Sequence, residues 1–173
     1  MQTSNSKVLG VIFDTSLRHV KGKRVIDHFK TSLIDYIRSE FVDDDIFYLF
    51  HPQIIETMTL RGEQVSAISN YETDGWKFRL NYALEQTLYV LDAEHEDFKK
   101  YLILFTDRFD AKPIERLSKI KERQMIDCEL LVFTIGDSDP HKMSLCEVGL
   151  IDVKDVEKIK DQLMENLKYG HNP

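Results

Sequence analysis

Short apolar runs alternate with amphipathic segments along most of the chain. The strongest runs are short enough to be buried strands of a sheet, and they cover 7–14, 46–51, 100–107 and 128–137. A more polar run at 56–62 predicts an edge strand, and a short run at 149–153 predicts a last strand. The pattern therefore predicts a sheet whose central strands are buried.

Between these runs, apolar residues recur at spacings of three and four, which is typical of amphipathic helices. The spacing predicts a long helix over about 22–42 and a second helix with leucines from Leu80 to Leu91 on one face. A third helix opens near Pro113, since proline suits a first helical turn. A last helix carries apolar residues from Val156 to Leu167.

Strands that alternate with helices predict an α/β fold. We expect a three-layer arrangement, with a mostly parallel central sheet, right-handed crossovers and helices on both faces. The predicted single domain covers 7–168, between a flexible N-terminus at 1–6 and a flexible C-terminus at 169–173.

Composition narrows the class of protein. The chain has 173 residues, of which 42% are hydrophobic and 31% charged, so one domain with a real core is expected. A net charge of -7 disfavours a nucleic-acid partner. No apolar run approaches the roughly 20 residues that span a bilayer, and the polar start shows no signal peptide. Two cysteines, including Cys128 at a predicted strand start, suit a reducing compartment, so we predict a cytoplasmic protein without membrane contact.

Acidic and hydroxyl side chains stand where two central strands end. Asp14 and Ser16 follow the first strand, and Asp107 follows the strand at 100–107. Open α/β sheets place their sites at the carboxyl ends of their strands, and converging oxygen ligands suit a hard cation such as Mg²⁺. The alternative is that these strand-end acids cap a helix or hold a loop.

At these positions the sequence resembles the von Willebrand factor A domain family. The resemblance rests on "VIFDTSLR", "TDGWKFRLNYAL", "LILFTDRFD" and "LLVFTIGDSD", and on the order of the elements. It implies a metal-ion-dependent adhesion site, built from D-x-S-x-S, a threonine and T-D-G, which a partner's carboxylate often completes. By this resemblance, Asp14, Ser16 and Asp107 match metal ligands.

The sequence departs from that pattern at bulky side chains. Arg18 replaces the second serine, Phe78 replaces the threonine and Arg108 replaces the glycine. We therefore predict a degenerate site without a cofactor, with Mg²⁺ as the remaining candidate. Two carboxylates held together without a cation repel, so one pKa would rise. Arg18 would supply the missing positive charge through an ion pair, unless its side chain simply points into solvent.

Positive charge gathers near the predicted helix starts at the same face of the sheet. These residues are Arg18, Lys21, Lys23, Arg24, Lys77, Arg79, Arg108 and Lys112. Helix N-termini favour anions, so we predict a non-enzymatic adaptor that binds a protein partner with an acidic segment, or a phosphate-bearing ligand, at this face. Trp76 would anchor the partner or cover the core edge.

Two other functions stay open from the sequence. The segment "FDTSL" is similar to the D-x-D-x-T strand of haloacid dehalogenases, which implies a Mg²⁺-dependent phosphohydrolase with Asp14 as nucleophile. Ser16 stands at the position of the second acid, which removes the proton donor. Alternatively, the edge strand at 56–62 would pair with another chain in an assembly.

Overall fold

The computed structural model describes residues 6–42, 44–50, 55–59, 65–72, 80–108, 110–135 and 149–167. Its centre is a sheet in the order β5-β4-β1-β6-β7-β8. The strands are β1 (Lys7–Asp14), β4 (Ile46–Phe50), β5 (Ile55–Thr59), β6 (Lys99–Thr106), β7 (Glu129–Thr134) and β8 (Gly149–Asp152). All neighbours pair in parallel except β5, which runs antiparallel to β4 at the edge.

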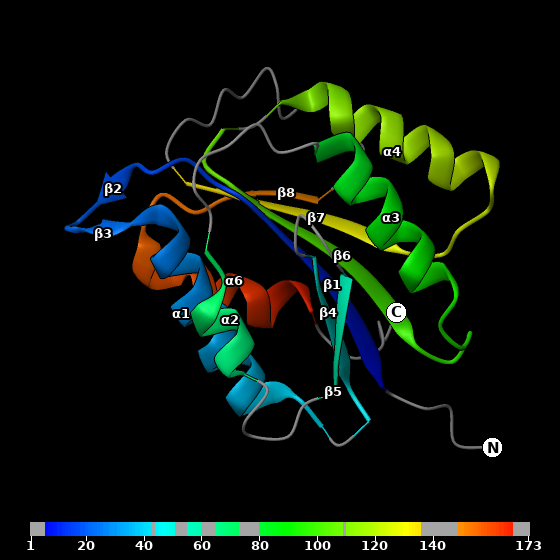
Figure 1. Ribbon diagram of the computed structural model, residues 1–173, viewed down its shortest axis with the longest axis horizontal. Coiled ribbons are helices and arrows are strands. Elements are labelled where there is room, and N and C mark those ends of the chain that lie inside the picture. The colour runs from blue at the N-terminus through cyan, green and yellow to red at the C-terminus, as the bar shows by residue number, and fades with distance from the viewer. Residues whose placement is uncertain are drawn as a thin grey trace.

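Helices cover both faces of this sheet (Figure 1). One face carries α1 (Val25–Glu40), α2 (Ser66–Asn70), a 3-10 turn at Val156–Lys158 and α6 (Ile159–Asn166); the other carries α3 (Leu80–Asp92) and α4 (Ala111–Arg123). The predicted three-layer α/β architecture is therefore confirmed. Within the described residues, no helix is both long and apolar enough to cross a membrane.

Alternation along the central strands divides the core into two layers. Phe13, Phe105 and Phe133 face α1 and α6; the rings of Phe13 and Phe105 stack with centroids 5.2 Å apart, and those of Phe105 and Phe133 are tilted with centroids 5.4 Å apart. Ile12 and Leu104 face α3 and α4. All five side chains are at most 2% exposed, which explains why these strands read as continuous apolar runs.

The structure corrects the predicted first helix. It begins at Val25 rather than near position 22, because a hairpin of β2 (His19–Val20) and β3 (Lys23–Arg24) precedes it. The hairpin turns at Lys21 and Gly22, whose φ angles are 49° and 79°. Such positive φ values are incompatible with a helix start.

Other boundaries shift by a few residues. The strand predicted to reach 137 ends at Thr134, and α4 begins at Ala111, where the Asp110 side chain accepts a hydrogen bond from the Lys112 amide at 3.1 Å. Cys128 is buried just before β7, as predicted.

Candidate functional site

The carboxyl edge of the sheet brings together the predicted site residues of β1 and β6. Asp14, the last residue of β1, pairs in register with Thr106, the last residue of β6. Asp107 comes next in the chain after Thr106, so it lies near Asp14. Ser16, Arg18 and Arg108 lie in the segments that leave these two strands. The predicted residues Trp76, Lys77 and Phe78, like the strand-end residues His51 and Asp137, fall outside the described part of the chain.

Asp107 is the centre of this group. Its side chain is 1% exposed, and its Oδ1 accepts a hydrogen bond from the Ser16 amide at 2.8 Å. The Ser16 hydroxyl donates a second, short hydrogen bond to Oδ2. A buried carboxylate with two donors is well stabilised, so Asp107 fixes the segment after β1 against the end of β6.

The Arg18 side chain reaches from the Asp107 carboxylate to the residue that follows β7. Its Nε lies 3.7 Å from Asp107 Oδ2, and its Nη2 donates a hydrogen bond to the Ile135 carbonyl at 2.8 Å. Its backbone amide donates to the Ser16 hydroxyl at 3.2 Å. The side chain therefore does not simply extend into solvent, although 44% of it is exposed.

Arg108 supplies a second guanidinium; the sequence analysis placed it in the positive rim but did not predict that it would pair with both acids. Its Nη2 lies 3.8 Å from Asp14 Oδ1 and its Nε lies 3.9 Å from Asp107 Oδ1. Burial raises the pKa of Asp14, the nearby Arg108 opposes that rise, and Asp107 adds to it. The two acids thus share the Arg108 guanidinium, and Asp107 has Arg18 as a second partner.

Several known structures have the same architecture. A von Willebrand factor type A structure from Catenulispora acidiphila matches with a TM-score of 0.67 and 15% identity, over 92% of this chain and 41% of that one. The pilus adhesin SpaC of Lactobacillus rhamnosus GG, in its open conformation, matches with a TM-score of 0.66 and 13% identity, over 92% and 29%. The manganese-loaded TRAP protein of Plasmodium vivax matches with a TM-score of 0.59 and 13% identity, over 93% and 72%.

The chain has a von Willebrand factor A-like fold. It spans less than half of the length of the first two of these structures. No family model and no curated protein matches the sequence. The likeness at these identities establishes the fold, and the function has to be argued from the site.

In this von Willebrand factor A-like domain, Asp14, Ser16 and Asp107 are the residues that would hold a metal. Their surroundings fit a cation poorly, because the Ser16 hydroxyl already donates to Asp107 and both carboxylates have guanidinium groups within 4 Å. The described residues contain no group of three or more acidic, histidine or cysteine side chains that could hold a metal ion.

A polar row extends along the same edge, and the sequence analysis missed most of it. Asp14, Thr106, Thr134 and Asp152 share one register position across β1, β6, β7 and β8, so their side chains leave the same face of the sheet. Both carboxylate oxygens of Asp152 are buried and accept no hydrogen bond from any residue that the structure describes. Only the pairing register reveals this row, and the sequence pattern does not specify it.

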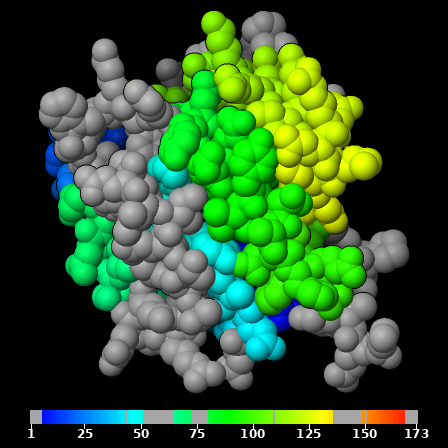
Figure 2. Space-filling model, turned by 45° about the vertical axis from the view of Figure 1, so that its right-hand side comes forward, coloured from blue at the N-terminus to red at the C-terminus, as the bar shows by residue number. Residues whose placement is uncertain are grey.

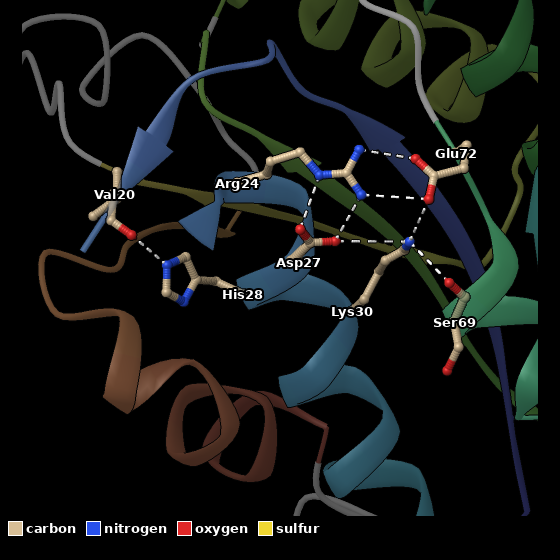
Figure 3. Close-up of polar contacts among 7 residues, drawn as sticks. All are labelled: Val20, Arg24, Asp27, His28, Lys30, Ser69 and Glu72. Carbon is tan, nitrogen blue, oxygen red and sulfur yellow. Dashed lines mark hydrogen bonds and ion pairs between the residues drawn. The ribbon is translucent and has the colours of Figure 1, made fainter. Parts of the chain in front are cut away.

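The predicted rim of positive charge is largely paired within the chain. Arg24 donates to Asp27 and to Glu72, each at 2.9 Å, and these bonds lower the pKa of both carboxyls. The buried Lys30 donates to the Ser69 carbonyl at 3.1 Å, so α1 is joined to the end of α2 (Figure 3).

The hairpin is held to the helices in a similar way. His28 on α1 contacts the Val20 carbonyl at 2.7 Å (Figure 3), and Lys21 lies 3.5 Å from Asp155. Together with Arg18 and Arg108, the described arginines of the rim thus all form ion pairs with acids of this chain. Among the described residues of the predicted rim, Lys23 and Lys112 form no ion pair, and Arg18 and Arg108 are the ones that lie beside the acids of the site.

Proposed function

We propose that this chain is a non-enzymatic protein-binding domain that uses the carboxyl edge of its sheet, with Arg18 and Arg108 in the place of a metal ion. The observation that carries the proposal is the position of the guanidinium groups: Arg108 lies beside both Asp14 and Asp107, and Arg18 lies beside Asp107. Similar structures include part of a pilus adhesin, which is consistent with a binding role.

The partner contributes an acidic segment. In a metal-bearing site, a partner carboxylate binds the cation; here it would bind guanidinium N–H groups, which match a carboxylate in a bidentate geometry. Leu17, which is 53% exposed beside Arg18, adds an apolar contact. Trp76 and Lys77 belong to the proposed contact surface as well.

The first experiment measures thermal unfolding in EDTA and then with millimolar Mg²⁺ or Mn²⁺. A ligand that binds the native state raises the unfolding midpoint by mass action. We expect no rise, because the arginines occupy the cation's place. A rise that Asp14→Ala abolishes would overturn the proposed replacement and restore a metal-dependent mechanism.

The second experiment tests binding at this edge. Arg18→Glu is expected to weaken capture of the partner, while Arg38→Glu, an exposed charge reversal at the far end of α1, leaves it unchanged. Equal capture by both variants would refute the electrostatic mechanism. Hydrolysis of p-nitrophenyl phosphate that requires both Mg²⁺ and Asp14 would instead establish the phosphohydrolase.

A further inference from the structure

A groove between α3 and α4 lies on the face of the molecule shown in Figure 2, where these two helices are side by side. It has a volume of about 510 Å³. Its wall on α3 is formed by Glu85 and Tyr89, and its wall on α4 is mostly basic. None of these residues belongs to the carboxyl-edge site.

The basic wall is a regular stripe. Lys112, Arg116, Lys119 and Arg123 recur at helical spacings of four, three and four, so they share one face of α4. The stripe is about 16 Å long at the rise of an α-helix. All four residues are exposed to solvent.

Most of this charge is not neutralised within the chain. Arg116 lies 3.7 Å from Glu85, but Lys112, Lys119 and Arg123 form no ion pair with any residue that the structure describes. The contrast with the carboxyl edge is clear, because the arginines there are paired. In a protein of net charge -7, an unpaired basic stripe is an unusual local field.

The floor of the groove is apolar. Ile120 is partly buried between the basic residues, and the ring of Tyr89 is 36% exposed. The Tyr89 hydroxyl accepts a hydrogen bond from the Gln124 side chain at 3.3 Å and donates to Glu85 at 3.4 Å, so the ring has a fixed position. A ligand here meets apolar surface between positive charges.

We propose that this groove binds an acidic amphipathic helix of a partner protein, about three turns long. A helix lying along α4 would place Asp or Glu residues, spaced by three and four, against Lys112, Lys119 and Arg123. Its apolar side chains would contact Ile120 and Tyr89. Glu85 and Glu115 line the same groove. A helix can place neutral side chains opposite these two carboxylates, whereas a nucleic acid carries a phosphate at every nucleotide and cannot avoid them.

The test uses the full chain and a fluorescein-labelled helical peptide with Glu at positions i, i+4, i+7 and i+11 and Leu between them. Lys119→Glu or Arg123→Glu is expected to weaken binding about tenfold. Arg38→Glu is the charge-matched control and leaves the affinity unchanged. Added salt weakens binding, since the charges are exposed.

Amide chemical shifts locate the peptide and separate this inference from the proposed function. Shifts centred on Tyr89, Lys119, Ile120 and Arg123 support the groove, and Arg18→Glu does not alter them. Shifts centred on Ser16 and Asp107, or no binding at about 1 mM peptide, overturn the proposal. Tighter binding of a short DNA oligonucleotide than of the peptide also overturns it.

Discussion

Lys7 and Asp45 form an ion pair inside the protein, at the amino edge of the sheet. Their side chains are 1% and 0% exposed, and Lys7 Nζ lies 3.7 Å from Asp45 Oδ2. Asp45 also accepts hydrogen bonds from the backbone amides of Lys7 and Val42, both at 2.9 Å. The rings of Tyr36 and Phe41 lie 5.1 and 5.2 Å from Nζ.

Removing either Lys7 or Asp45 should lower the free energy of unfolding, and the loss should be larger for Asp45. Burial lowers the pKa of Lys7, and Asp45 and then Glu40 oppose that shift, so Asp45→Asn removes the larger of the two counter-charges from a buried ammonium. We expect a loss of about 3–5 kcal/mol of unfolding free energy. Lys7→Met leaves the Asp45 carboxylate with both backbone donors, so the expected loss is smaller, about 1–3 kcal/mol.

The double variant Lys7→Met/Asp45→Asn tests whether the loss of stability comes from an uncompensated buried charge. Because it removes both charges, it should lose less stability than the sum of the single variants. Urea unfolding followed by circular dichroism gives all three values, with the urea slope as a check that the unfolded state is unchanged. Strictly additive losses would refute the argument.

The exposed pair Lys99–Glu129 is the matched control. Its atoms are closer, at 2.9 Å, but the side chains are 38% and 36% exposed. Solvent screens such a pair, so Lys99→Met should cost no more than about 1 kcal/mol. If Lys99→Met lowered the free energy of unfolding as much as Asp45→Asn does, burial would not explain the cost of breaking the Lys7–Asp45 pair.

Two further predictions concern β1. Because burial raises the pKa of Asp14 above its ordinary value of 3.8, the folded state binds more protons than the unfolded state above that pH, and the free energy of unfolding falls as pH rises through the folded pKa. Asp14→Asn should therefore raise the unfolding midpoint at pH 7 and lose this advantage below about pH 3.8; a gain independent of pH would contradict the raised pKa. Gly10→Ala should destabilise the fold by about 1–3 kcal/mol, because the added Cβ would lie 2.5 Å from Thr87 Cγ2 on α3. Urea unfolding measures this loss. An unchanged midpoint would show that α3 moves away at no cost in free energy.

The sequence pattern predicted the main elements because each has a strong period of its own. The run at 7–14 became β1 with the same bounds, and the polar run after β4 became the antiparallel edge strand β5 (Ile55–Thr59). The hairpin before α1 was missed, since strands of two residues show no periodicity. The five-residue helix α2 was missed because it is too short for an apolar stripe.

Strand-end reasoning brought Asp14, Ser16 and Asp107 together, because parallel strands end at one edge. It did not predict that Arg24 would bind Glu72, 48 residues away. Pairing of long side chains depends on tertiary distances that no local pattern contains. The basic stripe of α4 was visible as a helical spacing, but only the groove beside Tyr89 gives it significance.

Replacing a metal by arginine changes how a partner would be held. A guanidinium has five N–H donors, and Arg18 uses Nη2 on Ile135 while its Nε faces Asp107. Its other donors form no hydrogen bond with a described residue, so they are available to an incoming carboxylate. Because that guanidinium is partly exposed, the resulting contact should weaken with salt and be insensitive to chelators. A metal-held contact would be lost when a chelator is added, so a chelator titration separates the two mechanisms.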